Sequence, residues 1–445
     1  MPGREAPVAS IIEQGGHCVL APLKLGIAGL GHVGCGLIEL IERQARLRLP
    51  GEVQVTGVSA RSRSRNRPVE IGNYEWFDDA GELAASENID AFIELMGGSD
   101  GPAKIAVEAA LEAGKPVVTA NKALIAEHGQ ALADLAERKG VDLLFEAAVA
   151  GGVPVVRALR DSLCGVEVSR VSGILNGTCN FLTTEMLASG RSYDEVLAEA
   201  QNLGYAEADP TLDVSGMDAA HKVAILSAMA FSADLDFSKV ELEGVDGVTL
   251  LDLRLADRLG YRIKLIAEGV AANGGVVCRV APMALEFGHP LAQVNGSLNT
   301  VRIEGEPLGA VTLTGPGAGP GPTASAVVGD IAKLFNPGVR SAFGGAKHHL
   351  SRKFVGTRKS EQAAFFLHVR LSDRSGALAG VSEALAEANV SIDKLLQDSA
   401  DAENVSPVAI VTHPCARSGI DDAVARLSQL DAVVDATRVI RIEAN

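Results

Sequence analysis

Residues 23–34, which read LKLGIAGLGHVG, decide the fold of the first part of this chain. The apolar run 23–28 predicts a buried strand, and a helical pattern of apolar residues follows from Leu37 to Ile41. Between them stands the pattern GxGxxG, whose glycines allow a tight turn, a close approach of a pyrophosphate and close packing of helix on strand. This order predicts a Rossmann domain that binds a dinucleotide through Gly29, Leu30, Gly31, His32, Val33 and Gly34.

The end of the second predicted strand indicates which dinucleotide is bound. This strand, VQVTGV at 53–58, leads into Ser59, Ala60 and Arg61, so it lacks the acidic residue that holds the ribose 2′-hydroxyl of NAD. An arginine there accommodates the 2′-phosphate of NADP. We therefore expect NADP, with NAD as the alternative, and Arg61 as the first candidate for the phosphate contact, followed by Arg63, Arg65 and Arg67. A basic loop that is only solvated is the other interpretation.

Two further apolar segments are expected to bring residues to the cofactor. The predicted strand 91–96 ends before Gly97, and the predicted strand 116–122 ends in Lys122. Ligands of doubly wound sheets bind at the carboxyl ends of the strands. Gly97 and Lys122 are therefore expected near the nicotinamide, although a lysine at a strand end is also compatible with a merely solvated residue.

A second informative stretch, residues 200–224, reads AQNLGYAEADPTLDVSGMDAAHKVA. From Ser215 the pattern predicts a helix, which places Asp218 and Lys222 one turn apart on the same face. An acidic cluster around one lysine can bind an ammonium group, and the lysine can exchange a proton with a neighbouring oxygen. The alternative is a capping box from Ser215 to Asp218 with an ordinary surface ion pair to Lys222. The acidic residues of the cluster are Glu207, Asp209, Asp213 and Asp218.

Length and composition limit the class of protein. A chain of 445 residues is too long for one hydrophobic core and predicts two or three domains. The net charge of −16 argues against a nucleic-acid partner, and the longest apolar runs are too short to span a membrane. The N-terminus lacks the apolar segment of a signal peptide, and the six cysteines show no CxxC spacing. These features predict a soluble cytoplasmic protein with reduced thiols.

Six motifs that occur in one order along the chain together resemble homoserine dehydrogenases. They are GLGHVG, VVTANKALIAEHG, FEAAVAGGVPV, GILNGTCNFLTTEM, LGYAEADPTLDVSGMDAAHK and GPGAGPGPTA, and the resemblance covers roughly residues 23–350. Homoserine dehydrogenases are NAD(P)-dependent oxidoreductases that interconvert L-homoserine and L-aspartate 4-semialdehyde in threonine, methionine and isoleucine biosynthesis. The resemblance implies an α/β protein with an N-terminal Rossmann domain, an α+β catalytic and dimerisation domain, and a segment at about 315–345 that returns to the Rossmann domain. It also implies a homodimer or homotetramer.

The resemblance also assigns residues to the reaction. It implies that Lys222 is the proton donor and acceptor at the reacting oxygen, and that Lys122 orients this oxygen. The residues implied to anchor the substrate or to hold the catalytic lysine are Gly204, Glu207, Asp213 and Asp218, and Gly319 is expected at the cofactor. The residue types agree, because homoserine carries an ammonium, a carboxylate and a hydroxyl group. A second ammonium group near Lys222 would lower its pKa and favour proton transfer at moderate pH.

The segment 146–153 resembles the monovalent-cation site of this family, with sodium as the expected ion. The resemblance implies ligation by the carboxylate of Glu146 and by backbone carbonyls near Val149, Gly151 and Val153. Oxygen-only ligation suits a hard cation. The alternative is a glycine-rich hinge that Glu146 caps. Cys179 is expected to be a buried spectator thiol, because no neighbouring histidine in the sequence provides a base.

The last part of the chain predicts a small regulatory domain. After a basic and polar linker, the pattern predicts the order strand, helix, strand, strand, helix, strand, a ferredoxin-like unit that resembles an ACT domain. Threonine, the end product of the pathway, is the expected effector. Ser375 stands where the usual turn has proline, so a domain used only for assembly is the alternative. The predicted division is a leader at 1–22, the Rossmann domain at 23–150, the catalytic and dimerisation domain at 151–345, the linker at 346–361 and the ACT domain at 362–445.

Two other functions stay open on the sequence alone. One is a different amino-acid dehydrogenase of the same plan, such as an enzyme acting on aspartate, and the acid-rich stretch 200–224 argues against it. The other is a non-catalytic amino-acid sensor, and the presence of Lys122, Asp218 and Lys222 argues against that reading.

Overall fold

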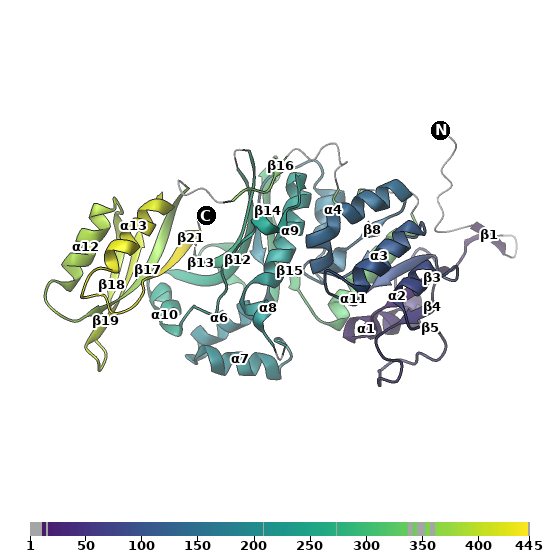
Figure 1. The fold of residues 1–445 in the computed structure, drawn as a ribbon, viewed down its shortest axis with the longest axis horizontal. Coiled ribbons are helices and arrows are strands. Elements are labelled where there is room, and N and C mark those ends of the chain that lie inside the picture. Colours follow the sequence, from purple (N-terminus) through teal and green to yellow (C-terminus); the bar gives the residue numbers. More distant parts are fainter. Residues whose placement is uncertain are drawn as a thin grey trace.

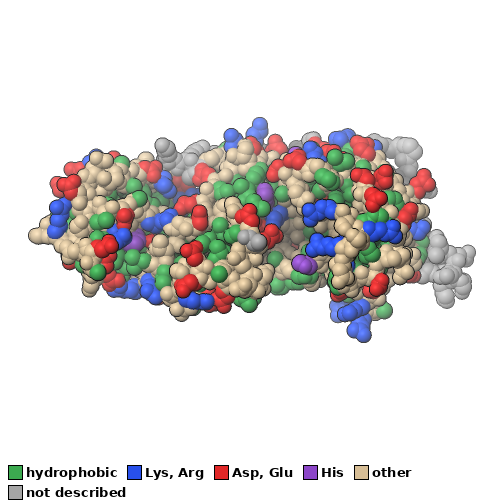
Figure 2. Space-filling model, turned by 60° about the horizontal axis from the view of Figure 1, so that its bottom comes forward, with side chains coloured by type: hydrophobic (Ala, Val, Ile, Leu, Met, Phe, Trp, Pro, Cys, Tyr) green, Lys and Arg blue, Asp and Glu red, His purple; other side chains and the backbone are tan. Residues whose placement is uncertain are grey.

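The protein is elongated, with three parts arranged in a row (Figure 1). The computed structural model describes residues 11–14, 17–336 except 208 and 273, 341–344, 352–356 and 361–443. Of the predicted leader, β1 (Ile11–Gln14) and β2 (His17–Leu20) form an antiparallel hairpin. On the face drawn in Figure 2, acidic and basic side chains are interspersed along the molecule. Within the described ranges, no helix combines the length and the apolar character needed to cross a bilayer.

The first part is a doubly wound parallel sheet with the strand order β5-β4-β3-β6-β7-β8. The strand β3 lies between β4 and β6, so the strand order reverses beside it, where ligands bind in such folds. The strands are β3 (Leu23–Ala28), β4 (Val53–Ser59), β5 (Glu75–Phe77), β6 (Ala91–Glu94), β7 (Val117–Thr119) and β8 (Leu143–Leu144). The helices are α1 (His32–Glu42), α2 (Ala80–Ala85), α3 (Pro102–Glu112) and α4 (Lys122–Lys139). This arrangement confirms the predicted Rossmann fold.

Two predicted strands end earlier than expected. The strand β6 ends at Glu94, and β7 ends at Thr119, so Lys122 is the first residue of α4. The cause is Asn121, whose side-chain oxygen accepts a hydrogen bond from the backbone N–H of Leu124 (3.1 Å) and thereby caps the helix. The prediction that Lys122 belongs to the strand was therefore wrong, although the residue still stands at the carboxyl edge of the sheet.

The second part is built on long antiparallel strands that belong to an 11-stranded sheet. Helix α9 covers this sheet and is buried on nearly all sides, because its apolar residues contact both β12 and the Rossmann part. The strands of this part are β9 (Glu167–Ile174), β10 (Ala233–Asp234), β11 (Glu241–Leu242), β12 (Tyr261–Ala272), β13 (Gly275–Glu286), β14 (Leu298–Glu306), β15 (Gly309–Pro316) and β16 (Arg352–Lys353). The helices are α5 (Val155–Arg157), α6 (Gly177–Ser189), α7 (Tyr193–Asn202), α8 (Thr211–Val214), α9 (Met217–Phe231) and α10 (Leu250–Arg258).

After β15 the chain returns to the Rossmann part. Helix α11 (Pro320–Lys333) packs against α1, and its apolar residues Ala324, Val327 and Ile331 join the core under β3. The resemblance implied such a return at about 315–345. The segment between β15 and α11 thereby lies next to the glycine-rich turn, which begins α1.

The third part has the expected ferredoxin-like topology, with the strand order β21-β17-β19-β18. Its elements are β17 (Gln362–Ser372), α12 (Ala377–Glu387), β18 (Ile392–Gln397), β19 (Val405–Thr412), β20 (Cys415–Ala416), α13 (Arg417–Leu427) and β21 (Arg438–Glu443). The strand β21 also pairs in parallel with β13, residues 441–443 opposite 283–285. The sheet of the ACT part therefore continues the sheet of the catalytic part. Most of the predicted linker 346–361 lies outside the described residues. Within this linker the structure describes 352–356 and Glu361.

Charged side chains reinforce this junction. Arg170 on β9 binds Glu268 on β12 (2.5 Å) and also Glu443 on β21. The other contacts are Arg279 Nε to Glu268 (2.6 Å), Arg279 Nη2 to Glu361 (2.8 Å) and Arg441 Nη2 to Glu361 (2.7 Å). Three arginines and three glutamates thus balance in charge across the boundary between the two parts.

Candidate active site

A cleft of about 790 Å³ lies where the Rossmann part meets the catalytic part. It brings together most of the residues predicted for cofactor and substrate, although they come from distant parts of the sequence. Those that line it are His32, Val33, Gly97, Lys122, Gly151, Gly204, Glu207, Asp213, Asp218, Lys222 and Gly319. Those outside its lining are Gly29, Leu30, Gly31 and Gly34 in the turn before and at the start of α1, Arg61 after β4, and Glu146, Val149 and Val153.

The glycine-rich turn fits a dinucleotide pyrophosphate. Gly29 has a φ of 103°, and a Cβ there would lie 2.4 Å from the carbonyl oxygen of Leu95. A Cβ at Gly34 would lie 2.0 Å from the carbonyl oxygen of Gly29, which explains the close packing of α1 on the turn. A Cβ at Gly31 would meet nothing within 4 Å, so the space above this residue is open to a phosphate group. Gly31 is the N-cap of α1 and makes no side-chain cap, and the N–H groups at a helix start favour an anion.

Two lysines share one carboxylate at the other end of the cleft. Asp218 Oδ2 lies 2.8 Å from Lys222 Nζ, and Asp218 Oδ1 lies 2.5 Å from Lys122 Nζ. Asp218 and Lys222 are buried, whereas the side chain of Lys122 is 42% exposed toward the cleft. Lys222 also donates a hydrogen bond to the carbonyl oxygen of Leu175 (2.7 Å). Lys222 is therefore held in place by the charged carboxylate of Asp218 and by the neutral carbonyl group of Leu175.

The burial and the charges determine the pKa values of this group. Burial lowers the pKa of Lys222, and the ammonium group of Lys122 lowers it further, whereas Asp218 acts in the opposite direction. Contact with Asp218 raises the pKa of Lys122. For Asp218, burial alone would raise the pKa, but the two lysines outweigh burial and hold it below its usual range. The result is a permanent carboxylate next to a lysine that loses its proton more readily than a free one.

The capping-box interpretation of this segment was wrong. Helix α9 begins at Met217, and Gly216, with a φ of 83°, separates it from α8, whose last turn ends at Ser215. Ser215 Oγ accepts a long hydrogen bond from the N–H of Met217 (3.5 Å), but it does not form a capping box with Asp218. The pair is also not a surface ion pair, because Asp218 and Lys222 are only 6% and 7% exposed.

Asn176 connects the carboxylates and was missed in the sequence. Its Nδ2 donates hydrogen bonds to Asp213 Oδ1 and to Asp218 Oδ2, both 2.9 Å away. Its Oδ1 accepts from the N–H of Cys179 (2.7 Å) and caps α6. An asparagine before a helix can be recognised in a sequence as a helix cap. The other partners of Asn176, Asp213 and Asp218, lie more than thirty residues further along the chain, so the sequence does not indicate these contacts. Burial raises the pKa of Asp213, and the nearby charge of Asp218 raises it further.

The remaining predicted substrate residues differ in position. Glu207 is exposed at the cleft, and Gly204 reaches the cleft with a φ of 75°. Asp209 accepts hydrogen bonds from the N–H and the hydroxyl of Thr211 at the start of α8, so it serves the local turn and not the cleft. Cys179 is buried, which raises the pKa of its thiol well above the usual value. This thiol is therefore a poor nucleophile, as expected.

A buried glutamate shapes the wall next to Gly97. Glu94 Oε1 accepts hydrogen bonds from the N–H groups of Met96 (2.7 Å) and Gly97 (3.2 Å), and Oε2 accepts from Thr119 (2.5 Å). Asn121 donates to the carbonyl oxygen of Gly98 (2.7 Å) and holds the same loop. The support that Glu94 and Asn121 give to this loop was not predicted from the sequence, because it depends on contacts inside the fold.

The arginines after β4 have different surroundings. Arg67 donates hydrogen bonds to the carbonyl oxygens of Leu30, Ser62, Arg63 and Arg65, so its guanidinium holds the loop together. Arg63 and Arg67 also lie over the ring of Trp76, at 5.8 and 5.9 Å. Arg61 and Arg65 are exposed on the loop. Of the four predicted candidates, these two have their guanidinium groups available for a phosphate.

Glu146 is buried behind the cleft. Its Oε1 accepts a hydrogen bond from the N–H of Val156 (3.1 Å), and its Oε2 accepts one from the N–H of Arg157 (2.8 Å). These two bonds are expected if Glu146 caps the glycine-rich hinge, the alternative to a cation site. Burial and the neighbouring carboxylate of Asp330 raise the pKa of Glu146 to about 7. Arg157 stands 3.8 Å from Glu146 and 3.3 Å from Asp330. The positive charges of Arg157 and Arg160 act on both buried carboxyl groups and lower their pKa values, against the effect of burial.

Comparisons with known proteins agree with these observations. The homoserine dehydrogenase family model matches residues 154–332, the model of its NAD-binding domain matches 29–146, and the ACT domain model matches 366–432. The homoserine dehydrogenase of Pseudomonas aeruginosa is 38% identical over 95% of this chain and 99% of its own length. That of Mycobacterium tuberculosis is also 38% identical, over 95% of this chain and 98% of its own.

Solved structures extend the likeness to three dimensions. The structure of a homoserine dehydrogenase from Thiobacillus denitrificans has a TM-score of 0.87 and 36% identity, and the match covers 95% of this chain and 98% of that one. A mutant of a hyperthermophilic archaeal homoserine dehydrogenase in complex with NADPH has a TM-score of 0.62 and 29% identity, over 71% of this chain and 98% of that one. The chain belongs to the homoserine dehydrogenase family and carries a C-terminal ACT domain.

Proposed function

We propose that Lys222 is the general acid and base with which this dehydrogenase interconverts L-homoserine and L-aspartate 4-semialdehyde. The observation that carries the proposal is a buried lysine that lines the cleft, has a lowered pKa and is fixed by Asp218 and the carbonyl of Leu175. General acid–base catalysis needs a group whose pKa lies closer to the working pH than that of a free lysine.

The chain supplies groups that suit the ammonium group and the reacting oxygen of the substrate. The carboxylates of Glu207 and Asp213 line the cleft and bind the ammonium group of homoserine, next to the exposed backbone of Gly204. Lys122 orients the reacting oxygen while Asp218 holds its ammonium group. Neutral Lys222 accepts the hydroxyl proton, and the oxygen that loses this proton becomes the aldehyde oxygen. A bound nicotinamide would supply the acceptor for the hydride that leaves the carbon carrying this oxygen.

The preferred cofactor in this proposal is NADP. The absence of an acidic residue after β4 and the exposed guanidinium of Arg61 support it. Gly29, Leu30, Gly31, His32, Val33 and Gly34 would hold the pyrophosphate at the start of α1, with Gly97, Lys122 and Gly319 on the nicotinamide side of the cleft. NAD remains the alternative, and the ratio of the two efficiencies tests the choice.

A monovalent cation, sodium, is proposed next to Glu146. Its ligands would be the second lone pairs of the Glu146 carboxylate together with the carbonyl oxygens of Val149, Gly151 and Val153. The all-oxygen donor set and the raised pKa of the buried Glu146 support a cation in this position. Gly151 also lines the cleft, so an ion there would support the backbone that faces the cofactor.

The biological setting of the enzyme is also a proposal. Threonine, methionine and isoleucine biosynthesis would use its product, threonine would bind at the ACT domain, and the cytoplasm would be its compartment. A homodimer or homotetramer is supported by β15, an exposed edge strand whose free backbone groups can pair with a second copy. Light scattering combined with size-exclusion chromatography measures the number of copies.

The reaction is tested with purified protein by following NADPH formation with L-homoserine, L-aspartate and no amino acid. NADPH formation with L-homoserine, and not with L-aspartate, would support the interconversion of L-homoserine and L-aspartate 4-semialdehyde. Turnover of aspartate would identify a different dehydrogenase of the same plan. Binding of an amino acid without any turnover would identify a sensor.

A further inference from the structure

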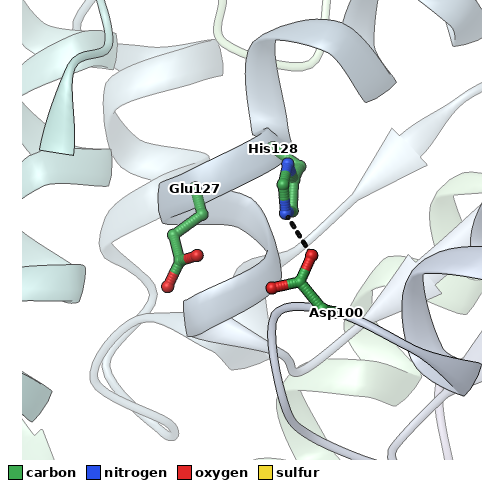
Figure 3. A group of neighbouring side chains, drawn as sticks. All are labelled: Asp100, Glu127 and His128. Atoms are coloured by element: carbon green, nitrogen blue, oxygen red, sulfur yellow. Dashed lines mark hydrogen bonds and ion pairs between the residues drawn. The ribbon is translucent and has the colours of Figure 1, made fainter.

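A group of side chains outside the cleft has the composition of a metal site. Asp100, Glu127 and His128 each offer one ligand atom, and these atoms lie within 4.8 Å of one another. Glu127 and His128 extend from α4, and Asp100 reaches them from the loop after β6 (Figure 3). The pair His128 Nε2 and Asp100 Oδ1 is 3.1 Å apart. Tetrahedral ligands about 2.1 Å from a zinc ion lie about 3.4 Å apart, so the exposed side chains of Asp100 and Glu127 would rotate inward to close the set.

A buried histidine approaches the same group from the catalytic part. His221 on α9 is 8% exposed, and its Nε2 lies 3.9 Å from Glu127 Oε1. Within the part of the chain that the structure describes, neither of its ring nitrogens has a hydrogen-bond partner. The ring stacks on Phe237 with the centroids 4.6 Å apart, so its orientation is fixed. An imidazole nitrogen that faces a carboxylate across this distance leaves room for a shared metal ion.

We propose that Asp100, Glu127, His128 and His221 bind one divalent transition-metal ion of the zinc type. Imidazole nitrogen favours zinc and its neighbours in the first transition row, whereas magnesium and calcium prefer oxygen ligands alone. Asp100, Glu127 and His128 would supply three positions of a tetrahedral zinc site. His221, which lies outside this group of three but 3.9 Å from Glu127, would move closer to supply the fourth. This site is distinct from the proposed sodium site, whose ligands are all oxygen.

The position of the site indicates what an ion would do there. Asp100 follows the loop that holds Gly97 in the cleft wall, α4 begins with Lys122, and His221 precedes Lys222 on α9. One ion would therefore join the cofactor loop and the two lysine-bearing helices. It would act as a clamp between the Rossmann part and the catalytic part, without contact to the substrate.

The test is a zinc titration by isothermal calorimetry on full-length protein without an affinity tag, after treatment with EDTA. We expect one zinc ion per chain in the native protein. His128→Ala, Asp100→Asn and His221→Phe should each weaken binding by about tenfold or more, because even residues that only support metal ligands contribute about 10–100-fold. The matched control is His413→Ala, since His413 and Asp393 form an exposed pair 3.9 Å apart in the ACT part.

A second measurement separates loss of the site from loss of the fold. Metal-free variants should melt at the same temperature as the metal-free native protein, and zinc should raise the melting temperature of the native protein and of His413→Ala only. Binding that is absent from the native protein, or equally strong in His128→Ala, would overturn the proposal. Unchanged affinity in His221→Phe would overturn the place of His221 among the ligands.

Discussion

Lys122 and Lys222 come from different helices, α4 and α9, and each contacts a different oxygen of the same carboxylate, Asp218. Asp218 raises the pKa of Lys222, and Lys122 lowers it, so the two neighbours act on the proposed base in opposite directions. The proposed base therefore has a pKa that can be moved either way by changing a neighbour.

The first prediction concerns pH. In the proposed mechanism, oxidation of homoserine needs neutral Lys222, so the rate should rise with pH through the pKa of this residue. Asp218→Asn removes the group that raises this pKa, and the profile should move to lower pH. Lys122→Gln removes the ammonium group that lowers it, and the profile should move to higher pH. Steady-state rates across the pH range provide the measurement, and shifts in the same direction for both variants would contradict the account.

The second prediction concerns the cofactor. Arg61→Asp should lower the efficiency with NADP by about tenfold or more relative to NAD, because a hydrogen bond to a charged group contributes about 1.5–3 kcal/mol. The control is Arg67→Ala, which removes the hydrogen bonds that hold the loop and should affect both cofactors equally. A change of ratio with Arg65→Asp, together with an unchanged ratio with Arg61→Asp, would transfer the phosphate contact to Arg65.

The third prediction concerns the cation. Activity of the native protein should be higher in sodium chloride than in choline chloride at equal ionic strength, and Glu146→Gln should remove this difference. The same variant should melt at a lower temperature. The substitution replaces one carboxylate oxygen with an NH2 group, so one of the N–H groups of Val156 and Arg157 would lose its acceptor. Equal activity of the native protein in both salts would argue that Glu146 has only its capping role.

The fourth prediction concerns the tail. Removal of residues from about 361 should abolish inhibition by threonine, because an effector acts through the part that binds it. The shortened enzyme should also melt at a lower temperature, since β13 loses its pairing with β21 and Arg279 loses Glu361. Inhibition of both forms would indicate that threonine binds the catalytic part. Inhibition of neither would make the tail an assembly module, as Ser375 in the turn allows.

Local sequence patterns predicted much of the fold. The apolar run that became β3, the glycines at 29, 31 and 34, and the six elements of the ACT part all follow from short-range periodicity and turn chemistry. The start of α9 was predicted two residues too early, because the left-handed Gly216 overrode the capping signal of Ser215. A glycine at a helix boundary was the stronger signal in this case.

The contacts that the sequence did not predict are long-range. Asn176 reads as a helix cap, and only the packing of α6 against α8 and α9 shows that its amide also joins Asp213 to Asp218. The pairing of β13 with β21 depends on the register of two strands far apart in the chain. The predicted linker indicated that the ACT part is a separate domain. In the structure, the pairing of β13 with β21 and the arginine–glutamate contacts join the sheet of the ACT part to that of the catalytic part. Such contacts are set by tertiary packing, which leaves no periodic signal in one sequence.

The central claim is that Lys222 transfers the proton at the reacting oxygen. The most direct measurement is the rate of NADPH formation from L-homoserine by the native protein and by Lys222→Ala, with NADP affinity determined separately by fluorescence titration. We predict that turnover falls by about a hundredfold or more, as expected for loss of a general acid–base group, while NADP affinity changes little. Near-normal turnover in Lys222→Ala would contradict the claim and remove this residue from the mechanism.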